Sequence, residues 1–366
     1  MEAFAQSCLT RWDLPEAASL SLVNVSENTT FRVDDPASSS TWALRVHRPG
    51  YHSLNAIRSE IAWSQALRAD GVVATPAVIA GRDGELVQIV AGHQPLSGHP
   101  REGGDPPKVQ GTTDAWTDPR LRGDDGSPQY AGGRYLEMPS DVRHVTLFEW
   151  EPGREPAETD LAAVALMGEA AARMHQHVRS WTPPSWFERR RWDFDTSLGR
   201  RPQWGRWQDG VGMTDEIEAI FVRTVALIES RLRRFGDGPD RFGLVHGDMR
   251  LANVLVHEGG LTVLDFDDCG FSWFLYDCAT AVSFFEHKPE AAACIAAWLD
   301  GYRRIRPLNA AEEAEIVTFV MLRRLLLVAW LGSRSQTDLA RTLGASYTQS
   351  AVPLCESYLR RMGSTA

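Results

Sequence analysis

Short runs in which apolar and polar residues alternate dominate the first part of the chain and predict β-strands. Two of these runs, at 20–25 and 31–33, flank a polar turn, which is the pattern of a hairpin. The other predicted strands lie at 41–47, 72–80, 86–90 and 143–149. This part of the chain is therefore predicted to be rich in β-structure.

One helix is predicted to interrupt these strands at 53–69. Its apolar positions include Leu54, Ile57 and Ile61, which follow the three- and four-residue spacing of an amphipathic helix. Ser53 is placed to cap the N-terminus, and an Asp-Gly pair follows the last turn. Several strands with a single helix predict a small α+β lobe.

Later in the chain the apolar residues recur at helical spacing. Helices are predicted at 160–179 and 214–235, and in several segments after 275. The most apolar segment, 316–331, carries an Arg-Arg pair at its middle. This segment is too short and too charged to span a membrane, so it predicts a buried helix whose two arginines have partners.

The change from strands to helices predicts two lobes, a β-rich lobe at 1–148 and a larger helical lobe at 149–366. A segment at 96–133 interrupts the first lobe. It is dense in Gly, Pro, Asp and Arg and has almost no apolar periodicity. We interpret this segment as a disordered insert that is dispensable for folding, because it has too few apolar residues to bury a core.

The composition of the 366-residue chain narrows the class of protein. Hydrophobic residues make up 43% and charged residues 23%, which is ordinary for a globular protein. The formal net charge of −10 argues against a nucleic-acid binder, which needs a basic field. No basic and then apolar stretch begins the chain, so we expect no secretory signal. The five scattered cysteines lack metal-ligand spacing and indicate a reducing, cytoplasmic compartment.

The candidate chemistry lies in the run 244–268. Its pattern predicts a strand, a loop, a second strand, a tight Glu-Gly-Gly turn and a third strand that ends at Asp265. Phosphoryl transfer needs a carboxylate that accepts the proton of the attacking hydroxyl, and oxygen ligands for Mg²⁺. Asp248, Asn253 and Asp265 supply these groups at the spacing that kinases use.

This run resembles the catalytic loop of the aminoglycoside phosphotransferases and of the related choline, homoserine and stress-response kinases. It is also similar, more distantly, to the loop of the protein kinases. The resemblance extends over nearly the whole chain outside 96–133, and includes 42–45 at the strand of the kinase lysine, Glu60, 167–175 and Asp277. It implies a two-lobed, protein-kinase-like α+β fold and a phosphotransferase that uses ATP and Mg²⁺.

The same resemblance implies roles for the residues of the catalytic loop. Asp248 would be the catalytic base, and Asn253 and Asp265 would ligate Mg²⁺. Arg250 falls where protein kinases place a lysine that contacts the γ-phosphate. Asp277 would brace the loop and would not touch the substrate.

The predicted phosphate contacts depart from the protein-kinase pattern in two places. Arg45 stands at the position of the strand lysine, where it would bind the α- and β-phosphates and pair with Glu60. No glycine-rich loop is present, and Ser26 and Asn28 occupy that turn. Their backbone amides and polar side chains would contact the nucleotide in place of the glycines.

The remaining predicted contacts concern the adenine and the acceptor. Glu149 and Trp150 should form the hinge, where backbone groups meet the adenine. Asp267 replaces the glycine of the D-F-G motif and Asp268 follows it; this pair could bind a cationic substrate, assist a second metal or cap a turn. Asp193, in a Trp-rich segment whose tryptophans should mostly pack in the core, is a further possible substrate contact.

Three functions stay open at this point. The first is a kinase that phosphorylates a hydroxyl of a small molecule, such as an aminoglycoside, an amino alcohol or a hydroxy amino acid. The second is a stress-response-type Ser/Thr protein kinase, and the third is a nucleotide-binding pseudokinase, which Arg45 makes conceivable. The complete set Asp248, Asn253 and Asp265 argues against the third. An enclosed acidic pocket would favour the first and an open shelf the second; we expect neither nucleic-acid nor membrane partners.

Overall fold

The structure is a computed structural model, and it describes residues 1–25, 28–91, 142–335 and 337–363. The predicted insert at 96–133 and the predicted phosphate contact Ser26 lie outside the described residues.

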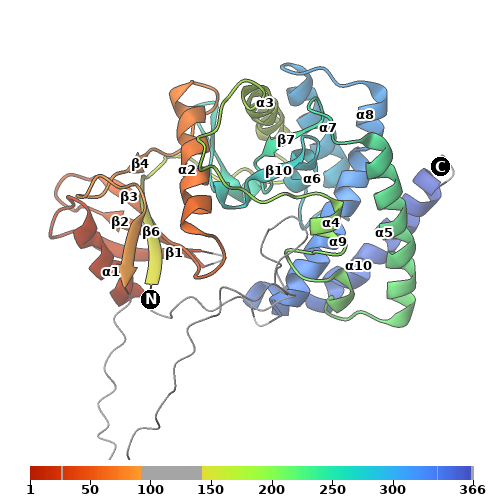
Figure 1. The fold of residues 1–366 in the computed structure, drawn as a ribbon, viewed down its shortest axis with the longest axis horizontal. Coiled ribbons are helices and arrows are strands. Elements are labelled where there is room, and N and C mark those ends of the chain that lie inside the picture. Colours follow the sequence, from red (N-terminus) through yellow and green to blue (C-terminus); the bar gives the residue numbers. More distant parts are fainter. Residues whose placement is uncertain (26–27, 92–141, 336, 364–366) are drawn as a thin grey trace, which may run out of the picture.

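An antiparallel sheet of six strands forms the first part of the described chain (Figure 1). Its order is β1-β2-β3-β6-β4, with β5 also paired to β6. The strands are β1 (Ser19–Val25), β2 (Thr29–Asp34), β3 (Thr41–Val46), β4 (Val78–Ile79), β5 (Gln88–Ala91) and β6 (Val142–Glu149). The predicted hairpin is confirmed, since β1 and β2 pair with Leu22 opposite Phe31.

The predicted strand at 72–80 is wrong over most of its length. Only Val78 and Ile79 pair with β6. Pro76 has no N–H to donate to a sheet, so regular pairing begins only after it. Before the proline, the chain instead touches the second half of the protein through a bridge between Ala74 and Thr262.

The predicted helix at 53–69 is present as α2 (Leu54–Ala69). The Ser53 side chain caps it by accepting a hydrogen bond from Ala56 N (3.0 Å), as the sequence predicts. The buried face of this helix contains apolar side chains and, in addition, the carboxylate of Glu60. In Figure 1 this helix stands between the sheet and the helical part of the chain. It therefore carries Glu60 to the boundary between the two parts.

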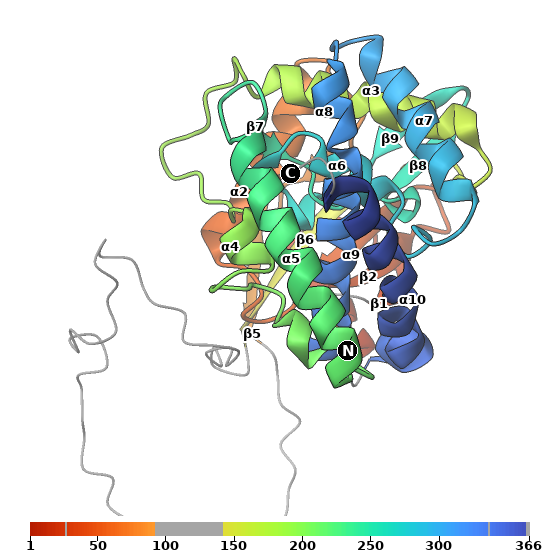
Figure 2. The ribbon, with the colours of Figure 1, turned by 90° about the vertical axis from the view of Figure 1, so that its right-hand side faces the viewer.

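The rest of the described chain is largely helical (Figures 1 and 2). Two short antiparallel pairs of strands, β7–β10 and β8–β9, lie within it. Their bounds are β7 (Phe242–Val245), β8 (Val254–His257), β9 (Gly260–Val263) and β10 (Gly270–Trp273). The helices are α3 (Leu161–His177), α4 (Phe194–Ser197), α5 (Asp215–Phe235), α6 (Tyr276–Ala281), α7 (Glu290–Arg303), α8 (Ala310–Ala314), α9 (Ile316–Ser333) and α10 (Asp338–Gly363), and a short α1 (Glu2–Cys8) precedes the sheet.

Two glycines allow α3 and α7 to pack at very short distance. A Cβ on Gly168 of α3 would lie 1.9 Å from the carbonyl oxygen of Trp298, and one on Gly301 of α7 would lie 1.8 Å from that of Ala165. Any larger residue at either position would force the helices apart. This contact fixes α3, whose His175 contacts Asp277, a residue that in turn binds the loop described below.

Separate hydrophobic clusters support the two lobes that we propose at 1–148 and 149–366. One cluster packs α1 against the sheet, and a larger one joins the helices of the second part. Trp63 and Leu67 of α2 belong to the larger cluster, so one face of this helix packs across the boundary.

The apolar segment with the Arg-Arg pair forms α9 in the centre of the helical part. Within the described ranges, Ala310–Ser333 is the helical segment long and apolar enough to cross a membrane, with a mean hydropathy of 1.7, and 78% of its window is buried inside the protein. Arg323 and Arg324 are both fully buried and both have partners. The prediction of a buried helix with two partnered arginines is confirmed.

Candidate active site

The catalytic loop leaves β7 and enters the β8–β9 hairpin through a short helical turn, η4 (Leu251–Asn253). Asn253 Nδ2 donates to the backbone oxygen of Asp248 (2.8 Å) and to its carboxylate oxygen Oδ2 (2.9 Å). The backbone oxygen of Asn253 accepts from Leu264 N (2.9 Å), directly before Asp265. The fold thus gathers the three residues that the sequence singles out for phosphoryl transfer.

A buried carboxylate shapes this loop. Asp277 accepts hydrogen bonds from His246 N (3.1 Å) and Gly247 N (2.8 Å). His175 of α3 lies 2.9 Å from the same carboxylate through Nε2. Gly247 has a φ of +79°, which favours glycine. These contacts support the bracing role that we propose for Asp277.

Two guanidinium groups contact the Asp248 carboxylate. Arg250 Nε lies 3.0 Å from Oδ2, and the side chain of Arg323 from α9 donates to Oδ1. Burial would raise the pKa of Asp248, but the charges of Arg250 and Arg323 outweigh it and hold that pKa below its usual range. Asp248 is therefore ionised at neutral pH, as a proton acceptor must be.

Arg323 is a site residue that the sequence analysis missed. The sequence predicts that this arginine has a buried partner but does not identify it. In the structure, Arg323 contacts Asp248, Tyr276 OH (3.2 Å) and Ser283 Oγ (3.0 Å). The sequence feature that pointed to Arg323 was the pair of adjacent arginines in the most apolar helical segment. A buried arginine requires an acidic or polar partner.

Arg45 of β3 contacts Glu60, as the sequence predicts, and also Asp265. Its guanidinium lies 3.4 Å from Glu60 Oε1 and 3.0 Å from Asp265 Oδ1. Asp265 has a left-handed backbone (φ 56°, ψ 70°), a strained conformation that is concentrated at functional sites. These two contacts support the prediction that Arg45 takes the place of the strand lysine, next to the predicted metal ligand.

The described oxygen donors fit Mg²⁺. The amide nitrogen Nδ2 of Asn253 donates to Asp248, which leaves the amide oxygen Oδ1 of Asn253 as a possible ligand. The Asp265 side chain is 35% exposed to solvent. An amide and a carboxylate oxygen are the hard ligands that this ion prefers, usually with waters and phosphate oxygens completing the shell. Asn253 and Asp265 would hold the ion, as the sequence predicts.

A cleft opens beside these residues. The side chains that line it are Asn28, Trp204, Asp248, Arg250, Asp265, Asp267, Asp268, Phe284, Arg323, Leu327, Trp330 and Leu339. Three of the predicted contacts therefore share one cleft with the catalytic residues, namely Asn28, Asp267 and Asp268. Helix α9 contributes Arg323, Leu327 and Trp330 to this lining, which also contains the four aspartates Asp248, Asp265, Asp267 and Asp268.

Asp267 and Asp268 differ in their surroundings. Asp268 accepts a hydrogen bond from Tyr51 OH (2.8 Å), and Tyr51 OH in turn accepts one from Trp204 Nε1 (3.0 Å). Asp267 instead points toward two histidines, His47 and His52. The two neighbouring carboxylates therefore face different groups.

The structure does not bring Asp193 to this cleft. Its side chain caps α4 by accepting from Thr196 N (3.0 Å), and it pairs with Arg191 (2.8 Å). Of the tryptophans around it, Trp192, Trp204 and Trp207 are buried, whereas Trp186 is 45% exposed. Packing is therefore the role of most of this Trp-rich segment.

Of the predicted hinge residues, Glu149 ends β6 and Trp150 follows it. Glu149 N donates to Ala77 O (2.9 Å), and Trp150 N donates to Thr41 O (3.3 Å). The Arg32 guanidinium covers the Trp150 ring at 5.0 Å. Since both N–H groups are engaged within the protein, an adenine contact through them is not supported, and a role for these two residues through other groups stays a prediction.

Comparisons with known proteins define the class. A sequence model of the phosphotransferase enzyme family (APH) matches residues 21–308. The chain therefore belongs to the phosphotransferase enzyme family. The predicted family, kinase-like α+β fold and phosphotransferase class are confirmed.

Individual relatives include small-molecule kinases. The solved structure of a microcompartment-associated aminopropanol kinase is 38% identical, covers 99% of this chain and 98% of that one, and superposes with a TM-score of 0.79. Amicoumacin kinase of Bacillus subtilis (strain 168) is 26% identical over 228 residues, and an uncharacterized protein of Deinococcus radiodurans is 28% identical over 238. These alignments cover 58% and 62% of this chain, and 62% and 66% of the respective relatives.

More distant structures share the fold. Amicoumacin kinase hAmiN, in complex with AMP-PNP, Ca²⁺ and Ami, is 19% identical with a TM-score of 0.67; the match covers 98% of this chain and 92% of that one.

We expect Arg45→Lys to keep nucleotide affinity and Arg45→Ala to weaken it by about tenfold or more, because hydrogen bonds to charged groups contribute about 1.5–3 kcal/mol. Isothermal titration with Mg²⁺-ATP measures both. Arg82→Ala, which removes an exposed arginine paired with Asp13, serves as the matched control. Wild-type affinity in both Arg45 variants would separate this residue from the nucleotide.

Proposed function

We propose that the protein transfers the γ-phosphoryl group of ATP, with Mg²⁺, to a hydroxyl of a small amino alcohol. The observation that carries this proposal is the contact set in which Asn253 binds the Asp248 carboxylate while Arg45 joins Asp265 to Glu60. These groups occur together where an in-line transfer needs a base, metal ligands and a phosphate clamp.

Each residue of the set has a separate task in this proposal. Asp248 orients the acceptor hydroxyl and accepts its proton. The Mg²⁺ held by Asn253 and Asp265 would neutralise charge on the phosphates. Arg45 positions the α- and β-phosphates from the sheet side. Arg250, whose guanidinium lies beside Asp248, contacts the γ-phosphoryl oxygens as they move to the acceptor.

The acceptor is proposed to carry an amine. Asp268 lies 8% exposed in the cleft that contains Asp248, and the tryptophan rings of Trp204 and Trp330 lie 6.5 Å apart in the same lining. A carboxylate beside aromatic faces is suited to an ammonium group. The aminopropanol kinase that is 38% identical supports an acceptor of this size.

A small molecule is favoured over a protein acceptor because the cleft is walled by buried side chains. Trp204 and Leu327 line it and are nearly inaccessible, and Arg323 on the same wall is 1% exposed.

We also propose a cytoplasmic location. All five cysteines are free and buried, as expected for a protein in a reducing compartment.

A panel of acceptors tests the amine. ATP consumption should be fast with aminopropanols and with short amino alcohols, and weak with propanols that lack the amine. Aminoglycosides, hydroxy amino acids and a generic protein substrate complete the panel. Equal turnover of the amine-free alcohols would contradict the proposed ammonium contact. Phosphorylation of the protein substrate and of none of the small molecules would favour the stress-response-type kinase.

We expect Asp268→Asn to raise the KM for an amino alcohol by about tenfold to a hundredfold, because an ammonium loses a charged partner worth about 1.5–3 kcal/mol. Asparagine keeps an oxygen that can accept from Tyr51 OH, so the fold should persist. The KM for ATP should change little. Asp193→Asn, outside the cleft, is the control, and an unchanged acceptor KM in Asp268→Asn would contradict the assignment.

A further inference from the structure

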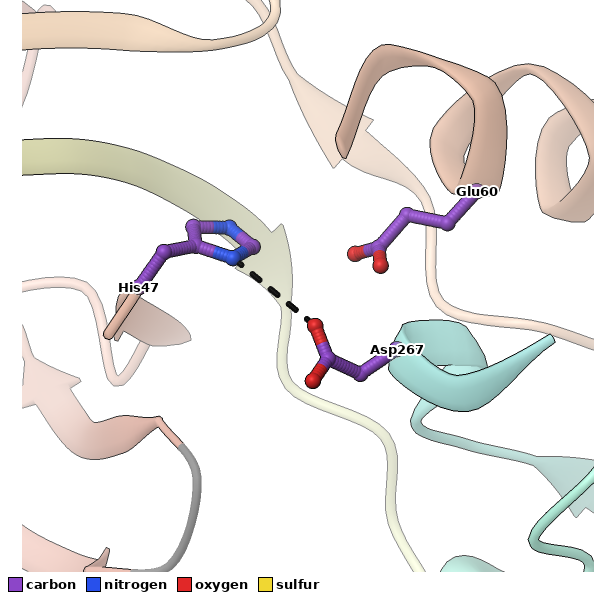
Figure 3. Close-up of side chains that lie close together, drawn as sticks. All are labelled: His47, Glu60 and Asp267. Atoms are coloured by element: carbon purple, nitrogen blue, oxygen red, sulfur yellow. Dashed lines mark ion pairs between the residues drawn. The ribbon is translucent and has the colours of Figure 1, made fainter. Parts of the chain in front are cut away.

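Four titratable side chains converge next to the Arg45–Asp265 pair. His47 follows β3, His52 precedes α2, Glu60 lies within α2, and Asp267 belongs to the turn η5 (Phe266–Asp268). Figure 3 shows His47, Glu60 and Asp267 pointing toward one another from three separate elements. These three residues are 3%, 2% and 4% exposed, so the cluster is closed to bulk water.

The atoms that face each other have no hydrogen-bond partners. This applies to His47 Nδ1, His52 Nε2, Glu60 Oε2 and both carboxylate oxygens of Asp267. Asp267 lies 4.0 Å from His47 Nδ1 and 3.6 Å from His52 Nε2, and both distances are too long for a hydrogen bond. A buried carboxylate without a donor is costly, and several such atoms around one point require an explanation.

Hydrogen bonds and ion pairs to residues outside the cluster hold this orientation. His47 Nε2 lies 3.2 Å from Thr146 Oγ1, which turns Nδ1 toward Asp267. Glu60 Oε1 is directed to Arg45, whereas Oε2 has no hydrogen-bond donor and lies 3.8 Å from the buried Arg189 guanidinium, beyond hydrogen-bond distance. Metal-binding histidines are typically oriented in this way by a partner on the other ring nitrogen.

Burial changes the protonation of two members of the cluster, which lies beside the charged Arg45 and Arg189. Burial lowers the pKa of His47 to about 3, so its imidazole is neutral and has a lone pair to offer. Burial and the neighbouring Asp267 carboxylate raise the pKa of Glu60 well above its usual value. A divalent ion between these groups would use the lone pair of the neutral imidazole and would favour the ionised form of Glu60.

We propose that His47, Glu60 and Asp267, with His52 at the edge, form a binding site for a divalent transition ion of the Zn²⁺ class. In one group, a nitrogen of His47 and one carboxylate oxygen each from Glu60 and Asp267 all lie within 4.8 Å of one another. In a second group, His52 joins Asp267 and Asp268 in the same way. Mixed imidazole and carboxylate ligands suit Zn²⁺, Co²⁺ or Mn²⁺, whereas Mg²⁺ prefers oxygen alone.

This ion would be distinct from the Mg²⁺ of the nucleotide. It would tie β3 and α2 of the sheet side to η5, two residues after Asp265. Because Glu60 offers Oε1 to Arg45 and Oε2 to the ion, both partners can be satisfied together. The site would therefore fix the Arg45–Glu60 pair and the metal-binding turn in one arrangement.

A spectroscopic titration tests the site in the full-length protein. Chelator-treated protein is titrated with Co²⁺ in excess Mg²⁺, and visible d–d absorption is recorded. We expect intense absorption that saturates at one Co²⁺ per chain, is displaced by Zn²⁺ and resists Mg²⁺. Absence of such absorption, or its loss to Mg²⁺, would overturn the proposal.

Variants separate this site from the nucleotide metal. Thr146→Val keeps the side-chain shape but removes the hydroxyl that contacts His47 Nε2, and should weaken Co²⁺ binding by about 10- to 100-fold. His52→Asn should weaken it as well. Asp265→Asn should leave it intact, and so should His257→Asn, which changes a half-exposed histidine elsewhere. Melting temperatures confirm that each variant is folded.

The pattern across the variants decides the outcome. Unchanged Co²⁺ affinity in both Thr146→Val and His52→Asn would refute the site. Loss of binding in Asp265→Asn alone would show that Co²⁺ occupies the nucleotide-metal position, which also contradicts the proposal. Neither result depends on catalytic activity, so the test is independent of the proposed reaction.

Discussion

Replacing Asp248 by asparagine should lower kcat by about 10²–10⁴-fold, the usual effect of removing a general base. Asparagine has nearly the same shape and can still accept from Arg250 and Arg323, but it cannot take a proton from the acceptor hydroxyl. The nucleotide contacts through Arg45 and Asp265 remain, so the affinity for Mg²⁺-ATP should stay close to that of the wild type.

Steady-state kinetics and nucleotide titration on the same preparation separate these two effects. Asp300→Asn changes an exposed aspartate on α7 and is a suitable control for the substitution itself. A variant that keeps most of its turnover would show that the proton acceptor lies elsewhere. A variant that loses nucleotide affinity would instead assign Asp248 to the phosphates.

Asp265→Ala should weaken Mg²⁺-nucleotide binding by more than about 100-fold. Even partners of metal ligands contribute about 10- to 100-fold to metal affinity, and this substitution removes a direct ligand. It also removes the carboxylate that lies 3.0 Å from Arg45, so the phosphate clamp loses its neighbour. Isothermal titration at several Mg²⁺ concentrations measures both the affinity and its metal dependence.

The backbone of Asp265 requires a second variant. Its left-handed conformation is tolerated by asparagine better than by alanine, so Asp265→Asn isolates the loss of charge from backbone strain. We expect Asp265→Asn also to weaken Mg²⁺-nucleotide binding, but by less than Asp265→Ala. Wild-type metal dependence in both variants would move the nucleotide metal to another carboxylate, most directly Asp267, which shares the cleft.

The sequence was most informative where function and local structure coincide. Asp248, Asn253 and Asp265 lie in one strand–loop–hairpin unit, so their spacing along the chain determines their spacing in the fold. The Ser53 cap and the β1–β2 hairpin are similarly local. Each of these predictions depends on neighbours a few residues apart, and such patterns are visible without the tertiary structure.

Features that depend on distant contacts were not predictable in this way. Arg323 reaches Asp248 across 75 positions of the chain, and His47 faces Asp267 from another element. Asp193 looked available to substrate because its cap on α4 and its pairing with Arg191 were not evident from the sequence. The strand predicted at 72–80 was shortened because Pro76 lies within it.

The central claim is that this phosphotransferase phosphorylates the hydroxyl of a small amino alcohol. Phosphorus NMR of the purified protein with ATP, Mg²⁺ and an aminopropanol tests it most directly, because the product itself is observed. The account predicts ADP and a new phosphomonoester signal coupled to the carbon-bound proton beside the acceptor oxygen, absent with Asp248→Asn. ATP that stays intact across all amino alcohols, or phosphate that is found only as free phosphate or on protein, would contradict it.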